Sequence, residues 1–147
     1  MHRGFKTVVA TLAVAGLTVG IAAAAAGGSQ KLDLLGPDGI AYCDGSGVLS
    51  GEPGGFGFAI INAPSNGAVE ATISAKNLTP NTTYNVLLIQ GVADCYTPDG
   101  TITTTAQGKG NLHVSEVSTS THALVQVVCT GYPCDPDDSF VTDTYYH

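Results

Sequence analysis

The chain has 147 residues, a formal net charge of −7 and only 12% charged residues, and it contains 19 glycines. An acidic surface repels phosphate groups, which makes nucleic acid and anionic lipid poor partners. Few charges combined with abundant Gly, Thr and Ser favour a β protein with many turns over a helical one.

Residues 1–26 have the pattern of a secretory signal peptide, with an Ala- and Gly-rich composition typical of bacterial export. Arg3 and Lys6 precede an apolar run from Val8 to Ile21, and Ala22–Ala26 supplies small residues for cleavage. A retained membrane anchor is the alternative, but the run is at the short end for spanning. Removal leaves three lysines against twelve acidic residues, a net charge of −9. We expect a secreted, extracellular protein of about 120 residues, the size of one domain, with no membrane attachment.

Residues 27–39 are polar and interrupted by Gly36, Pro37 and Gly39, so we expect a flexible lead-in before a single domain over residues 40–147. In that domain, short apolar runs separated by turn residues predict strands. They cover residues 40–43, 56–62, 69–76, 84–90, 101–105, 111–117, 122–129 and 140–146, and residues 48–51 form a weaker pairing segment. The pattern predicts an all-β fold, specifically an antiparallel β-sandwich of seven or eight strands.

The centre of this pattern is the stretch from Val69 to Gln90. Apolar and polar side chains alternate over residues 69–76, as in a strand with one buried face. The following segment, Leu78–Tyr84, resembles the tyrosine corner of immunoglobulin-like and fibronectin type III sandwiches. That resemblance implies that the hydroxyl of Tyr84 bonds to backbone a few residues upstream.

Two turns predict strand pairs. Asn66-Gly67 is a tight hairpin signal between the strands at 56–62 and 69–76. The Gly-rich stretch 107–110 predicts a second hairpin between the strands at 101–105 and 111–117.

Four cysteines follow the export signal, which predicts two disulfides. Cys129 and Cys134 flank Gly131 and Pro133, as a tight turn requires, so we pair them; Cys43 is then left with Cys95. A zinc site is disfavoured, because no C-x-x-C pair is present.

Two strands carry apolar residues on both faces. Leu87 and Ile89 oppose the Tyr84 face of one strand, and Leu124 and Val128 form the second face of the other. A sandwich buries only its inner face, so this outer face must be covered. The lead-in or a loop could cover it; a ligand groove or self-association are the alternatives.

No pattern of catalytic residues is present, so we expect no enzymatic activity and no cofactor. His113 and His122 fall on polar strand faces, where a solvated side chain is the ordinary outcome. The acidic cluster Asp135, Asp137 and Asp138 offers hard oxygen ligands that could hold Ca²⁺, although a solvated acidic turn explains it more simply.

The segment from Leu78 to Asp138 is also similar to the neocarzinostatin-type apo-chromoproteins, secreted actinobacterial sandwiches that carry an enediyne. The shared features are the Thr-containing corner before Tyr84, the Gly-containing turn within residues 103–111, and the Cys129-x₄-Cys134 spacing. The family's other disulfide closes a short loop after the Tyr strand, where this chain has only Cys95. No ligand-contacting residue can be carried over. The whole chain resembles uncharacterised secreted actinobacterial proteins with an N-T-T-Y corner.

Three functions follow as hypotheses. The first is a non-catalytic immunoglobulin-like module for binding or assembly with an unknown extracellular partner. The second is a carrier of an apolar small molecule, for which a concave apolar cavity would be expected. The third is an enzyme of a type that its sequence does not reveal. Fold class does not decide among them.

Overall fold

The computed structural model describes residues 28–135 and 138–147, so the expected signal peptide lies outside the described residues. The regular secondary structure of the described part consists almost entirely of antiparallel strands. The strands are β1 (Gln30–Leu35), β2 (Ile40–Ala41), β3 (Val48–Ser50), β4 (Pro53–Asn62), β5 (Ala68–Ala75), β6 (Thr83–Ile89), β7 (Gly100–Thr103), β8 (Gly110–Val117), β9 (His122–Cys129), β10 (Ser139–Thr142) and β11 (Tyr145–Tyr146), with a 3₁₀ helix η1 at Val92–Tyr96. The all-β prediction is confirmed.

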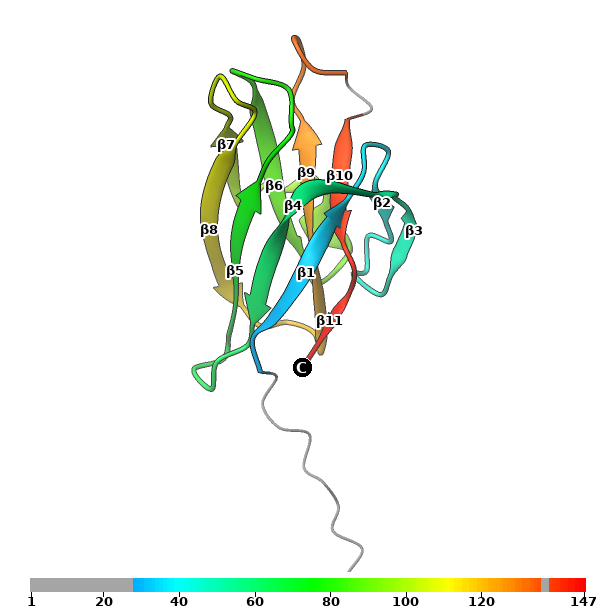
Figure 1. The fold of residues 1–147 in the computed structure, drawn as a ribbon. Coiled ribbons are helices and arrows are strands. Elements are labelled where there is room, and N and C mark those ends of the chain that lie inside the picture. Colours follow the sequence, from blue (N-terminus) through cyan, green and yellow to red (C-terminus); the bar gives the residue numbers. More distant parts are fainter. Residues whose placement is uncertain (1–27, 136–137) are drawn as a thin grey trace, which may run out of the picture.

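The strands form two layers (Figure 1). The front layer contains β1, β4, β5 and β8, and the back layer contains β7, β6, β9 and β10. Strand β1 joins the layers, because residues 30–33 and Leu35 pair with β4 while Leu34 and Leu35 also pair with β10. At the other side β7 and β8 approach closely, and a Cβ atom added to Gly100 would lie 2.8 Å from Leu112 Cδ2. The result is a flattened, nearly closed barrel.

The lead-in expected at residues 27–39 contains a strand instead. Leu32 and Leu34 of β1 point into the core and are at most 8% exposed. The intervening Lys31 and Asp33 are exposed, so β1 has a short alternating pattern. Only two alternating pairs are present, and the neighbouring Gly and Pro residues obscured this signal in the sequence.

The predicted hairpin between residues 101–105 and 111–117 is wrong. Strand β7 pairs with β6, and β8 pairs with β5 in the opposite layer. The hydroxyl of Thr104 donates to Thr79 O at 2.6 Å and accepts from Thr82 N at 2.9 Å. Gly108, at a φ of +68° that favours glycine, accepts a hydrogen bond from Leu78 N. These contacts tie the turn to the tyrosine corner, so the chain crosses to the other layer. The Asn66-Gly67 hairpin between β4 and β5 is confirmed.

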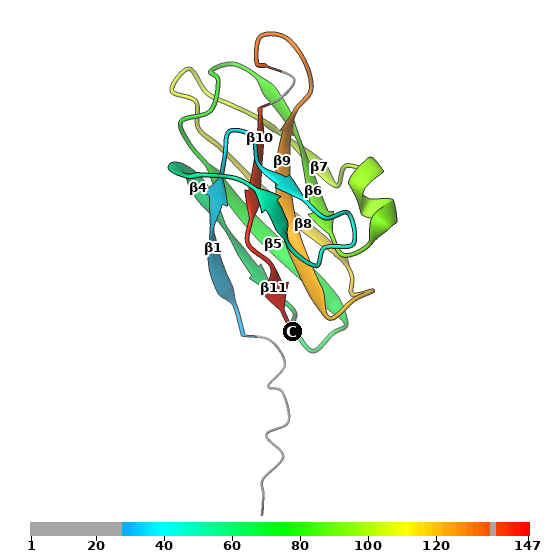
Figure 2. The same cartoon turned by 90° about the vertical axis from the view of Figure 1, so that its right-hand side faces the viewer.

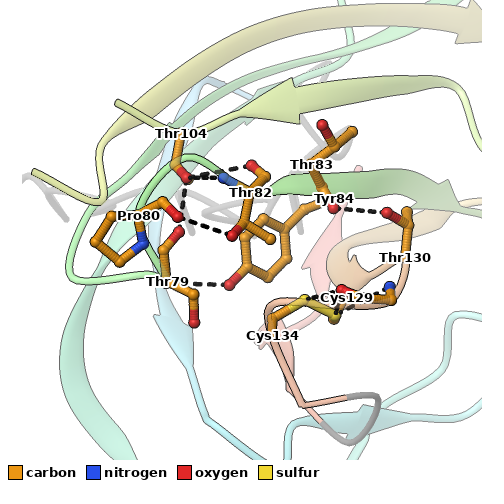
Figure 3. Close-up of a disulfide and its surroundings, with 10 residues drawn as sticks. Thr79, Pro80, Thr82, Thr83, Tyr84, Thr104, Cys129, Thr130 and Cys134 are labelled. Atoms are coloured by element: carbon orange, nitrogen blue, oxygen red, sulfur yellow. Dashed lines mark hydrogen bonds between the residues drawn. A yellow bond between two sulfur atoms is a disulfide. The ribbon is translucent and has the colours of Figure 1, made fainter. Parts of the chain in front are cut away.

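The main core lies between the layers and is pinned by Tyr84, which is fully buried. Its hydroxyl accepts a hydrogen bond from Thr79 N at 3.1 Å, five residues upstream (Figure 3). The tyrosine corner expected from the sequence is therefore present.

Both predicted disulfides form. Cys43 and Cys95 have Cα atoms 5.4 Å apart, and Cys129 and Cys134 have Cα atoms 6.2 Å apart. The second disulfide lies next to the Tyr84 ring (Figure 3). No described cysteine is free.

Candidate functional site

The outer face of β6 and β9 is covered along half of its length. Leu87, Ile89 and Leu124 are at most 5% exposed, whereas Val128 is half-buried. They belong to a second, smaller core cluster that also contains Ala41, Leu35, Val48, Cys95 and Val141. Of the binding face considered from the sequence, Ile89 and Leu124 are therefore closed off by other segments of the chain, whereas Leu87 and Val128 line a cavity.

Two segments provide the cover. The β2–β3 ribbon lies across β9 and β10, and η1 lies beside the end of β6 (Figure 2). The Cys43–Cys95 disulfide joins one segment to the other. At the end of the ribbon, His122 Nε2 lies 2.7 Å from Asp44 O, which fixes the turn after β2 against β9.

Between the two covering segments lies a cavity of about 400 Å³, here called the outer hollow. Its volume is within the range of small-molecule sites, about 300–1,000 Å³. Its lining residues are Ile40, Ala41, Cys43, Asn85, Leu87, Cys95, Tyr96, Pro98, Gln126 and Val128.

The floor of the outer hollow comes from the two paired strands. Asn85 of β6 lies opposite Val128 of β9, and Leu87 lies opposite Gln126. Successive outward positions on each strand therefore place two apolar and two amide side chains in one small array. This array is the part of the outer face that the β2–β3 ribbon and η1 leave open.

The rim of the outer hollow is apolar and exposed. Tyr96, at the end of η1, is 79% exposed, and Ile40, on β2, is 51% exposed. An exposed aromatic ring beside a concave apolar floor can close over a bound molecule, and it would lose water contact when doing so. Neither residue was singled out from the sequence. The predicted Cys43–Cys95 bond is the signal that could have brought residues 40–43 and 95–98 together.

Carboxylates hold η1 in place. Asp94 Oδ2 accepts hydrogen bonds from Gln90 N and Gly91 N, both at 2.8 Å. Asp99 Oδ2 accepts a bond from Leu88 N at 2.6 Å. The wall of the outer hollow that carries Cys95 and Tyr96 is thus fastened to β6 on both sides by charge-assisted hydrogen bonds.

A third carboxylate, Glu116 of β8, completes this anchor. Partial burial, followed by hydrogen bonding and repulsion from Asp99, raises the pKa of Glu116 from 4.5 to about 7. Gln90 Nε2 donates to Glu116 Oε2 at 3.2 Å, and Gln90 Oε1 accepts from Thr119 N at 3.0 Å. The anchor therefore contains a carboxyl group that holds its proton to near neutral pH.

The predicted calcium site is only partly within the described residues. Asp137 lies outside them, and within the rest of the chain no group of three or more His, Cys, Asp or Glu side chains is arranged to hold a metal ion. Burial, and to a smaller degree repulsion from Asp135, raises the pKa of Asp138 above its usual range. Calcium binding at this loop remains a prediction.

The two histidines are not brought together. His113 Nδ1 lies 3.1 Å from the Thr72 hydroxyl on the exposed face of β8, whereas His122 packs beside Ser120 and the Asp44 turn. Each has its own local partner.

Comparison with known proteins does not assign this chain to a family. No protein-family model, curated protein or solved structure matches this chain. The resemblances to immunoglobulin-like domains and to neocarzinostatin-type proteins thus stay predictions, and the two-layered all-β fold is what the structure supports. No helix in the described part is long and apolar enough to cross a membrane.

Proposed function

We propose that this protein is a secreted, non-catalytic binding module that holds a small, mainly apolar molecule in the outer hollow. The observation that carries this proposal is the concavity itself: about 400 Å³ over Leu87 and Val128, walled by two segments that a disulfide joins. Binding sites for small molecules combine such a largely apolar lining with a few polar groups.

The surrounding structure supports a site that exists before ligand arrives. The floor belongs to two paired strands, one wall is fastened by Asp94 and Asp99, and the walls are linked through Cys43–Cys95. A site held in this way loses little conformational freedom on binding, so more of the contact energy contributes to affinity. Immunoglobulin-like identity and extracellular location belong to the proposal as well.

Filling the outer hollow tests the proposal. In Val128→Trp an indole replaces a half-buried side chain on the floor. The matched control is Ile60→Trp, which changes an outward aliphatic residue of β4 in the other layer that is 37% exposed. A neutral fluorescent probe, N-phenyl-1-naphthylamine, is titrated into the secreted protein and both variants, with thermal melts to verify folding.

We expect the wild type and Ile60→Trp to bind the probe equally and Val128→Trp to bind it at least tenfold more weakly. Native mass spectrometry of protein taken directly from culture medium should show an added mass on the wild type that is absent from Val128→Trp. Equal probe binding by all three proteins, or no probe binding and no added mass on the wild type, would contradict the proposal. A mass corresponding to a second chain or another protein would favour assembly instead.

A further inference from the structure

We propose that Asn85 and Gln126 select the ligand of the outer hollow, and that this ligand is a neutral ring compound carrying a hydroxyl or N–H group. The inference rests on the proposed function and names the chemistry that the floor of the hollow would recognise. The two amides lie on adjacent strands, each opposite an apolar residue of the same floor.

The carboxamide of Gln126 has a fixed orientation. Its Nε2 donates to Ser139 Oγ at 2.8 Å and to Gly39 O at 3.4 Å. Because Gly39 O can only accept, the nitrogen must be the atom on that side. Both N–H groups of the amide are then engaged. Its carbonyl oxygen Oε1 is left as an acceptor on a residue that lines the hollow.

The carboxamide of Asn85 is not engaged by the protein. Its side chain makes no hydrogen bond to another residue of the described part of the chain. Asn85 is half-buried, and it lines the outer hollow near the start of β6. An amide offers two donor hydrogens and an acceptor oxygen. A pure hydrocarbon seated over Asn85 would remove water from these groups without replacing the lost hydrogen bonds, and leaving a buried polar group unpaired in this way weakens binding.

The charges of the lining residues and of the whole chain further restrict the chemical class of the ligand. None of the residues that line the outer hollow is Asp, Glu, Lys, Arg or His. The chain as a whole is acidic, with a net charge of −7, so an anionic ligand would meet an unfavourable field and no compensating cation. A hydroxyl group can instead donate to Gln126 Oε1 and accept a second hydrogen bond from the Asn85 amide nitrogen, and an N–H group can donate to Gln126 Oε1 or to the Asn85 amide oxygen. The rings of the ligand would lie against Leu87, Val128 and Tyr96.

Three ligands of nearly the same shape separate these contributions: 2-naphthol, 2-methylnaphthalene and 2-naphthoate. Each is used to displace N-phenyl-1-naphthylamine from the intact secreted protein. We expect 2-naphthol to compete about tenfold more tightly than 2-methylnaphthalene, which corresponds to about 1.4 kcal/mol. We expect 2-naphthoate to be the weakest of the three.

The variant Asn85→Leu replaces the amide by an apolar group of similar size and should reduce the preference for naphthol over methylnaphthalene to threefold or less. The matched control, Asn111→Leu, changes an exposed asparagine of β8 in the other layer and should keep the full preference. If Asn85→Leu fails to fold, as judged by its melt, Asn85→Ala serves in its place.

The outcomes distinguish the two proposals. Probe binding with equal competition by naphthol and methylnaphthalene in the wild type would overturn the selectivity inference and leave the proposed function intact. An unchanged preference in Asn85→Leu would also overturn it. Absence of probe binding to the wild type would overturn the proposed function and this inference with it.

Discussion

The outer faces of the two layers differ although both belong to antiparallel strands. On the front layer, the outward residues of β5 and β8 include Thr72, His113 and Ser115, all exposed. On the back layer, the outward residues of β6 and β9 include Ile89 and Leu124, which are fully buried. A strand that alternates polar and apolar residues can face water, whereas a strand that is apolar on both faces requires a second cover. The covered face of the back layer is also the face on which the outer hollow lies.

The cover is uneven along that face. The turn after β2 packs against the end of β6, where a Cβ atom on Gly45 would lie 2.8 Å from Ile89 O. At the opposite end, Asn85 and Val128 remain accessible in the outer hollow. The cover thus buries the end of the face that carries Ile89 and Leu124. It leaves open the end where the amides of Asn85 and Gln126 interrupt the apolar surface.

The largest effect on stability is expected when the disulfide that holds the cover is removed. In Cys43→Ser/Cys95→Ser a ring spanning 52 positions is opened, and the chain-entropy relation gives a loss of about 4 kcal/mol in the free energy of unfolding. The matched control Cys129→Ser/Cys134→Ser opens a ring spanning 5 positions and should cost about 2 kcal/mol. Urea denaturation measures both. Equal losses would contradict the larger stabilisation expected from the Cys43–Cys95 bond.

The next largest effect is expected from truncating a buried residue on the outer face of the back layer, compared with an exposed one on the front layer. Leu124 is fully buried under the cover, so Leu124→Ala should lower the free energy of unfolding by about 3 kcal/mol. Ile60 lies on the outer side of β4 and is 37% exposed, so Ile60→Ala should cost less than about 1 kcal/mol. The two variants are compared by urea denaturation. A cost for Leu124→Ala no greater than that for Ile60→Ala would contradict a buried outer face on the back layer.

A substitution in the inner core should separate loss of fold stability from loss of the cover. Tyr84→Phe leaves Thr79 N without its partner and should cost about 2 kcal/mol. Tyr132→Phe, at a side chain that is 99% exposed, should have no measurable effect. Probe binding by folded Tyr84→Phe should match the wild type, because the corner lies on the inner side of the sheet. Weakened probe binding would show that the corner also shapes the outer hollow.

The smallest effect concerns the carboxylate anchor of η1. The pKa of Glu116 is raised to about 7 in the folded protein, so the folded state keeps a proton that the unfolded chain releases near its ordinary value of 4.5. Its contribution is therefore greatest below pH 4.5 and is lost as the pH rises from 4.5 to 7, by about 1 kcal/mol once solvent screening of this partly exposed group is included.

The neutral variant Glu116→Gln should remove this dependence, so that its stability relative to wild type increases between pH 4.5 and 7 and is constant above. Glu52→Gln, at an exposed residue, is the control. Thermal melts at a series of pH values measure the difference. A constant offset between Glu116→Gln and wild type across that range would rule out a raised pKa for Glu116.

Features that depend on local pattern could be predicted from the sequence. The strand at residues 69–76 was found because its alternation extends over the whole strand, and the strand at 122–129 was found because it is an apolar run between turn residues. The corner at Tyr84 and the pairing of Cys129 with Cys134 were found because both motifs lie within a few residues. The double-sided apolar character of Leu87, Ile89 and Leu124 also indicated a cover, since no sheet leaves such a face in water.

The tertiary structure decided what depends on residues far apart in the chain. It made β1 the strand that joins the two layers, sent β8 to the opposite layer from β7, and set Asn85 beside Gln126 under the walls that carry Ile40 and Tyr96. A repeating side-chain pattern determines that a segment is a strand and which of its faces is apolar. It does not determine which strand becomes its neighbour, because many pairings bury the same apolar surface and only the packed chain selects one.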